Sequence, residues 1–325
     1  MLKSVQLKLT KIKYSGDSIG DDIRIEIEIL GKFLRVDKRI KAGTTEKIDS
    51  EMRKIETDQQ QFKTEVTVTV IEKDILFNDV GRAQSTIKID TSDNKPQKFP
   101  FEVQIKETRS IWGKSWGSKT ALFEIILEAV VSDAVRYVPD IDGSQGFLIV
   151  RIEDSKLVRP VPAFLKLKPE RVSNEREYFI ILEGPYRGKM ASIKLRDNGS
   201  SWFISGVNHK PMIRAKYSIS QKVFFLKDKK YQATDYPDMP WEKGLYDIEI
   251  PDYAHKGGES YMDESKRAMT WFKIGHSGER YLHAGGHSRG CMTIIEVKRW
   301  MEIYDSLIKA RKGDFMSVGV LEIVD

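Results

Sequence analysis

Residues that can carry out chemistry gather near the end of this 325-residue chain. Cys291 is the only cysteine, and four of the five histidines lie shortly before it, at positions 255, 276, 283 and 287. A thiol reacts as its thiolate, so a reactive cysteine needs a base or a positive charge beside it. The spacing therefore predicts that Cys291 is a nucleophile and that His283 serves as its base.

The segments on either side of Cys291 predict how the two side chains meet. Residues 281–283 are typical of a short strand, and Gly290 allows a tight turn just before the cysteine. Apolar residues recur with a roughly helical period from Thr293 to Lys309, so we expect one amphipathic helix there. A cysteine at the start of a helix feels the positive end of the helix dipole, which favours the thiolate.

A longer pattern in this region resembles a known family. His283, followed by S-R-G-C at 288–291, is similar to the catalytic motif of L,D-transpeptidases (YkuD-type). Residues 240–248 resemble the P-x-G-x-Y-x-I strand of the same family. The resemblance covers residues 213–325 and implies a β-rich catalytic domain with one main helix.

The resemblance also implies roles and a substrate. Cys291 is the implied nucleophile and His283 its base, while Ser288 and Gly290 shape the turn. The amides of Gly290 and Cys291 contribute to the oxyanion hole. The implied substrate is a peptidoglycan stem peptide, and transpeptidation and carboxypeptidation share one thioester that needs no cofactor. The residues expected to contact the substrate are Arg289, His287, His276, Tyr281 and Trp271.

Two features depart from the family pattern. His283 lies only eight positions before Cys291, and Arg289 and Thr293 stand where many members have other polar residues. The short gap resembles the smaller exported antibacterial effectors of the superfamily. A second hypothesis is therefore an exported effector that attacks a rival's peptidoglycan.

Two further interpretations of Cys291 involve no acyl transfer. His283, His287 and Cys291 are spaced four apart, which on a helix would present three zinc ligands on one face. Glycines at 285, 286 and 290 disfavour a helix at this point. The other interpretation is a buried structural cysteine, because free cysteines are among the most buried residues.

Composition narrows the class of protein. The chain is 40% hydrophobic and 31% charged, as globular domains are. Its net charge of +6 is mild, and it lacks a basic stripe interleaved with aromatics, so we expect no nucleic-acid partner. We expect no transmembrane segment, because no apolar run approaches the length of a span. The family resemblance implies action in the periplasm or cell envelope. The start of the chain has no signal-peptide pattern, so cytoplasmic synthesis with non-classical export is one route.

Alternating apolar and polar residues predict a mainly β, multi-domain fold. Residues 1–135 form the first expected domain, a C2-like β-sandwich. Residues 144–212 form a small SH3-like barrel or spacer, with a Gly-Pro turn at 184–188. Residues 213–325 form the L,D-transpeptidase-like domain.

The C2 resemblance rests on two acidic loops. One contains Asp74 and Asp79, and the other contains Asp17 and Asp21. Oxygen ligands from adjacent loops are what Ca²⁺ needs, whereas turn-forming Asp and Asn explain the same residues without a metal. A third hypothesis is therefore a binding module whose C2-like domain contacts a membrane surface or a protein partner.

Overall fold

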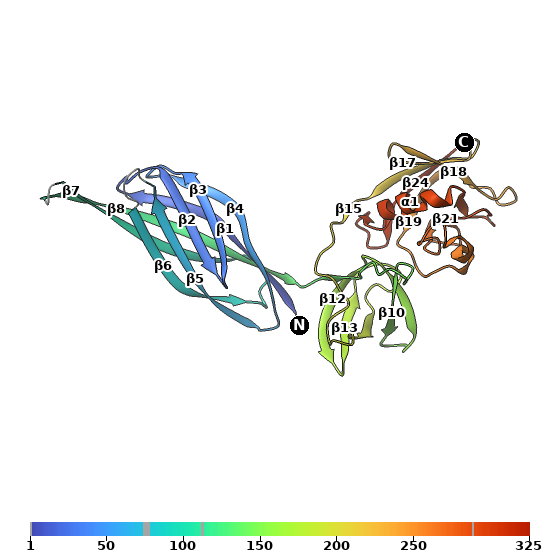
Figure 1. Cartoon of the computed structure of the whole chain (residues 1–325), viewed down its shortest axis with the longest axis horizontal. Helices are drawn as coiled ribbons and strands as arrows, with labels where there is room; N and C mark the ends of the chain where they lie inside the picture. Colours follow the sequence, from blue (N-terminus) through green and yellow to red (C-terminus); the bar gives the residue numbers. More distant parts are fainter. Residues whose placement is uncertain (1, 74–78, 112–113, 288) are drawn as a thin grey trace. The chain divides into compact units, whose positions relative to one another are not determined.

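The computed structural model describes residues 2–73, 79–111, 114–287 and 289–325. Strands hold 56% of the residues and helices 6%, which confirms the mainly β prediction. The chain forms two compact units, Met1–Ala134 and Val135–Asp325, drawn in Figure 1 from blue to green and from green to red. The first boundary lies one residue from the predicted end of the sandwich.

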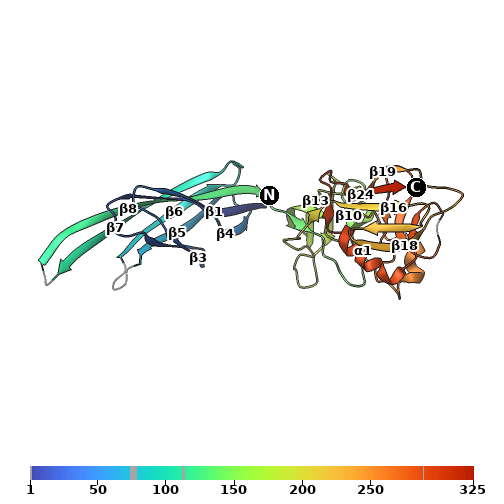
Figure 2. The same cartoon turned by 90° about the horizontal axis from the view of Figure 1, so that it is seen from above.

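The first unit is an antiparallel β-sandwich of two four-stranded sheets, with strand orders β4-β1-β8-β7 and β3-β2-β5-β6. Strands β7 and β8 extend beyond the other strands of their sheet (Figures 1 and 2). The strands are β1 (Lys3–Gly16), β2 (Asp22–Ile29), β3 (Lys32–Arg39), β4 (Thr45–Thr57), β5 (Gln61–Glu72), β6 (Asp79–Asp90), β7 (Gln97–Ile111) and β8 (Lys114–Asp133).

Side-chain alternation explains this sandwich. Val5, Leu7 and Leu9 of β1 are buried, and so are Ile23, Ile25 and Ile27 of β2, while the residues between them are more exposed. Because successive side chains of a strand point to opposite faces, each sheet turns one apolar face inward. The inward residues of both sheets form one hydrophobic core.

The second unit begins with a six-stranded antiparallel sheet of order β11-β10-β14-β13-β12-β9. A turn at 184–188 joins β13 to β14, and Gly188 N–H donates to the carbonyl of Ile181 (2.8 Å). The strands are β9 (Arg136–Tyr137), β10 (Phe147–Ile152), β11 (Val158–Pro162), β12 (Lys166–Ser173), β13 (Arg176–Ile181) and β14 (Met190–Lys194).

An eight-stranded sheet follows, with the order β19-β24-β16-β17-β18-β22-β21-β20. A bridge between Ile248 and Ile274 joins its end strands, so the sheet is a nearly closed barrel. Strands β15 (Lys210–Pro211) and β23 (Ala310–Arg311) form a separate parallel pair. The barrel strands are β16 (Ile213–Ser218), β17 (Val223–Leu226), β18 (Lys229–Thr234), β19 (Gly244–Glu249), β20 (Phe272–Lys273), β21 (Tyr281–Ala284), β22 (Met292–Ile294) and β24 (Ser317–Val324).

The two sheets of the second unit share one hydrophobic core. Leu165, Leu167 and Phe179 from the six-stranded sheet region belong to the same cluster as Ile250 and Leu321 from the barrel. The predicted sections 144–212 and 213–325 therefore lie within one compact unit. Their shared core fixes the barrel on the preceding sheet.

The helix begins later than the sequence suggested. Residues 292–294 form β22, a 3₁₀ turn spans Val297–Arg299, and α1 spans Trp300–Leu307. The prediction that Cys291 stands at a helix N-terminus is therefore wrong. Strand pairing prevails because the β-branched residues 293 and 294 fit a buried strand between β18 and β21.

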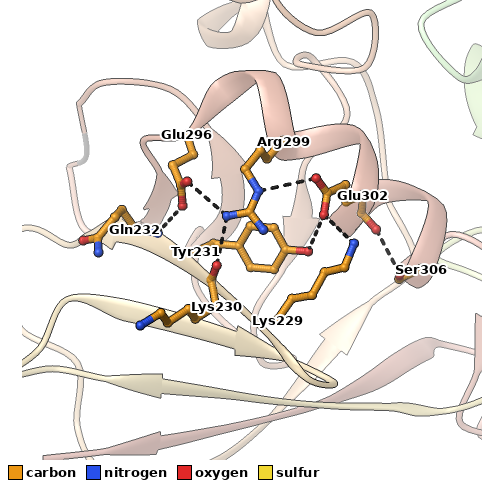
Figure 3. Close-up of polar contacts among 8 residues, drawn as sticks. All are labelled: Lys229, Lys230, Tyr231, Gln232, Glu296, Arg299, Glu302 and Ser306. Atoms are coloured by element: carbon orange, nitrogen blue, oxygen red, sulfur yellow. Dashed lines mark hydrogen bonds and ion pairs between the residues drawn. The ribbon is translucent and has the colours of Figure 1, made fainter.

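A polar network anchors α1 on the hairpin of β17 and β18 (Figure 3). Glu302 accepts hydrogen bonds from Lys229 (2.8 Å), Arg299 (3.4 Å) and Tyr231 (3.1 Å), and these lower its pKa to about 2. Glu296 accepts from the backbone N–H of Gln232 (2.6 Å). Because this segment follows β22 directly, the network also holds the strand that begins just after Cys291.

Candidate active site

Parallel pairing of β21 and β22 places Cys291 beside the strand of His283. Leu282 lies opposite Met292 and His283 opposite Thr293, so the register puts Cys291 level with Tyr281. Two residues of rise and one strand spacing separate the backbones of Cys291 and His283 by roughly 8 Å. Because residues opposite each other on paired strands share a face, His283 and Thr293 point to the same side of the sheet, and Cys291 lies one residue before β22.

The glycine-rich turn between these strands has contacts that require small residues. A Cβ on Gly285 would lie 3.1 Å from the ring of Tyr261, and Gly286 N–H donates to the Tyr261 hydroxyl (2.7 Å). Gly290 has φ +102°, a backbone conformation that favours glycine. This conformation supports the predicted role of Gly290 in the turn before Cys291.

His283 is held as a neutral base. Its side chain is buried, with 5% exposure, and Nδ1 donates to the Ala284 carbonyl (2.9 Å), which can only accept. Nε2 is therefore the basic nitrogen, and it receives the Thr293 hydroxyl (3.1 Å). Burial lowers the pKa of His283 to about 4, so the ring is uncharged at neutral pH and able to accept a proton.

A run of stacked rings fixes the plane of this imidazole. His283 stacks on Trp271 (4.1 Å between centroids), Trp271 stacks on His255 (4.4 Å), and His255 stacks on Tyr253 (4.1 Å). Asp252 accepts from His255 (3.0 Å) and from the Tyr281 hydroxyl (3.1 Å). The ring that would accept the proton is thus bound on its edge by hydrogen bonds and on its face by an indole.

The thiol of Cys291 has its own environment. Its residue is only 9% exposed, and burial raises the pKa of the thiol. The backbone N–H of Tyr281 and the positive charge of Arg280 act in the opposite direction. These two groups take the place of the helix dipole that the sequence predicted. The resting pair is consequently a thiol and a neutral imidazole, and direct contact between Cys291 and His283 stays a prediction.

The other predicted substrate residues divide into two groups. Tyr281 and Trp271 lie in the ring cluster, whereas His287 and Arg289 are exposed in the turn before Cys291. His276 lies elsewhere, since it pairs with Asp247 (2.7 Å) and Glu249 (3.2 Å) of β19. Ser288 lies outside the described residues.

Sequence reasoning missed three groups of this site: Asp252, Arg280 and the hydroxyl of Thr293. The sequence marked Thr293 only as a departure from the family pattern. Asp252 and Arg280 carried no local signal, because each reaches its partners through the fold. Only the charge of Arg280 just before the predicted strand 281–283 could have drawn attention to it.

The sequence suggested a zinc site around Cys291 and a calcium site at the acidic loops of the sandwich. Among the described residues, no group of three or more His, Cys, Asp or Glu side chains is arranged to hold an ion. Asp79 pairs with Glu72 at one end of the sandwich, where Glu72 also pairs with Ile23 and Lys73 N–H donates to the Asp22 carbonyl (3.0 Å). Asp74 lies outside the described residues, so calcium binding there stays a prediction.

Comparisons with known proteins add little to these observations. No family model matches the chain, and no curated protein matches it. Among solved structures, human GIVD cytosolic phospholipase A2 aligns at 8% identity with a TM-score of 0.25, over 66% of this chain and 34% of that chain. A TM-score this low supports no conclusion about fold or function. In the described part of the chain, no helix has the length and apolar character of a membrane span.

Proposed function

We propose that the second unit catalyses cysteine-dependent acyl transfer on peptidoglycan stem peptides, as an L,D-transpeptidase or L,D-carboxypeptidase. The observation that carries the proposal is the parallel pairing that places Cys291 beside the strand of a buried, neutral His283. The resemblance of the S-R-G-C motif to L,D-transpeptidases supplies the substrate class. The cell envelope is then the expected site of action.

The proposed reaction has two acyl-transfer steps. Sulfur of Cys291 attacks the carbonyl carbon of the peptide bond between an L- and a D-centre, while the thiol proton passes to Nε2 of His283. The C–N bond then breaks, the leaving amine takes that proton, and a thioester remains. An amine or a water molecule then attacks the thioester carbonyl and gives a proton to His283. The C–S bond breaks, and the released sulfur takes that proton to restore the thiol.

The two perturbed pKa values indicate how this reaction starts. The pKa of the thiol is raised and that of His283 is lowered, so a resting thiolate–imidazolium pair is disfavoured. Proton transfer would accompany the attack on the carbonyl. The Thr293 hydroxyl, which occupies Nε2 in this structure, must then turn away or pass the proton along.

Purified protein incubated with disaccharide-tetrapeptide tests the proposal. Mass spectrometry should show a covalent acyl-protein adduct and release of the terminal D-amino acid, or a cross-linked product when a second amine is present. Cys291→Ser should abolish adduct and turnover while retaining the wild-type circular dichroism. Unchanged muropeptides after periplasmic expression, together with no adduct in vitro, would exclude this substrate.

A further inference from the structure

Arg280 links the turn before Cys291 to a distant loop of the barrel. Its Nε donates to the Gly290 carbonyl (2.6 Å), and Nη2 donates to the Met239 carbonyl (2.8 Å). Its guanidinium also stacks on the Trp241 ring at 3.5 Å from the centroid. One side chain therefore connects residues 239–241 to the residue preceding the nucleophile.

The bond to Gly290 fixes the peptide that contains the Cys291 amide. In a trans peptide the carbonyl and the following N–H lie in one rigid plane and point in opposite directions. When Arg280 holds the Gly290 oxygen on one side, the Cys291 N–H must point to the other. Gly290, at φ +102°, has few steric limits of its own, so an external bond is needed to select one orientation.

The charge of Arg280 is not explained by stability alone. Its hydrogen-bond partners are neutral carbonyls, with the Pro240 oxygen a third at 3.4 Å, and burial lowers its pKa. Among the described residues no carboxylate forms an ion pair with it, and a partly buried cation in that situation costs free energy of folding. Cys291 directly follows the Gly290 carbonyl that Arg280 binds, and a thiolate there would raise the pKa of this guanidinium, as do Tyr246, Asp235 and Glu242.

We propose that Arg280 is a positioning residue for the nucleophile: it orients the Gly290–Cys291 peptide so that the Cys291 N–H faces the reacting carbonyl, and its charge stabilises the Cys291 thiolate. The first part rests on the proposed acyl transfer, and the second is independent of the substrate. Lysine supplies a charge but cannot reproduce a stacked, forked guanidinium. Different variants of Arg280 therefore test the orientation of the peptide and the stabilisation of the thiolate separately.

The first experiment measures the pH dependence of Cys291 alkylation by iodoacetamide, which reports a single site because the chain has one cysteine. Arg280→Met should raise the thiol pKa by about one unit, whereas Arg280→Lys should leave it closer to wild type. The other titratable neighbours stay constant across the variants: His283 and Tyr281 on β21, Arg289 in the turn, and the Asp235, Glu242 and Tyr246 already named.

The second experiment measures acyl transfer to the stem peptide. Both Arg280→Met and Arg280→Lys should lower kcat by about 100-fold, because loss of one aligned oxyanion donor has an effect of that order. Arg196→Met is the matched control, since Arg196 also stacks on an indole, that of Trp202 (4.8 Å), outside the site. It should leave thiol pKa and rate within twofold of wild type.

The outcomes separate this inference from the proposed function. A shifted thiol pKa in Arg280→Met, with wild type inactive on stem peptides, supports the role of Arg280 and refutes the substrate. An active wild type, with Arg280→Met unchanged in both thiol pKa and kcat, overturns the inference and keeps the substrate. Arg280→Gln, which retains hydrogen-bond donors without the charge, provides the pKa measurement if the methionine variant does not fold.

Discussion

The two compact units differ in what their cores contain. In the sandwich the buried residues are mostly apolar, and Glu72 is the one acidic or basic side chain among those described as buried there. The second unit buries Arg267, Glu183, His255 and His283, and it holds the cysteine and every histidine of the chain. Both units are β-rich, so strand content does not account for the difference.

The contrast teaches where chemistry can be placed in a β protein. The sandwich has long strands with regular alternation, which bury apolar side chains and expose polar ones. The barrel has strands as short as β20–β22, joined by loops that bring charged groups inward. Buried titratable groups with shifted pKa values tend to cluster at functional sites. In this protein such groups occur in the second unit.

The largest expected effect comes from removing the base. His283→Gln should lower acyl transfer by about 100- to 10,000-fold, because glutamine cannot take the thiol proton. Steady-state kinetics on the stem peptide measures this loss. The control is His209→Gln, a histidine of the same unit that bonds to the Phe164 carbonyl (3.2 Å). Equal losses in the two variants would show that His283 has only a structural role.

The stability of the two units should respond differently to acid. His283 has its folded pKa lowered from 6.5 to about 4, so its stabilising contribution is complete above pH 6.5 and is lost as the pH falls toward 4. The loss amounts to about 3 kcal/mol in the second unit. The sandwich has no histidine and should lack this step.

Hydrogen exchange measured separately over peptides of each unit at pH 7 and pH 4.5 checks this difference. In the second unit, His283→Gln should remove most of the pH-dependent loss of protection. Equal losses in both units, or an unchanged loss in the variant, would assign the effect to carboxylates instead of the buried histidine.

A smaller effect is expected from the ring stack. Trp271→Leu removes the indole on which His283 stacks at 4.1 Å, a contact worth about 1 kcal/mol. We expect a roughly fivefold lower kcat/KM and a His283 signal shifted in the imidazole NMR spectrum. Trp202→Leu, outside the site, is the control. A rate equal to wild type would mean that the edge contacts alone orient the ring.

The smallest effect should stay within the sandwich. Asp17 accepts a hydrogen bond from the Thr120 backbone N–H (2.8 Å), just past the end of β1 where it pairs with β8. Asp17→Ala should destabilise this unit by about 0.5 kcal/mol, and Asp17→Asn, which keeps an acceptor, by less. Chemical denaturation measures the change. Alkylation of Cys291 should be unaffected, and a change there would show that the units are energetically coupled.

Much of the fold could be predicted from local pattern. Apolar and polar residues alternate along β1 and β2, so the predicted β character of the first domain follows directly from the sequence. The helix was predicted to begin seven residues too early and to end two residues too late, because Thr293 and Ile294 satisfy a helical period as well as a strand. Pairing with β18 and β21 decided between helix and strand for these residues. A short stretch of sequence does not show which distant strands will pair with it.

The sequence by itself determined the chemical inventory: one cysteine, a cluster of histidines before it, and a glycine where the chain must turn. These features are local, because they depend on residue type and spacing along the chain. The tertiary structure decided the neighbours. In the folded chain His276 pairs with carboxylates of β19, Asp252 lies at the ring cluster, and Arg280 donates to the Gly290 carbonyl. Such contacts depend on long-range packing, which brings together residues that the sequence separates.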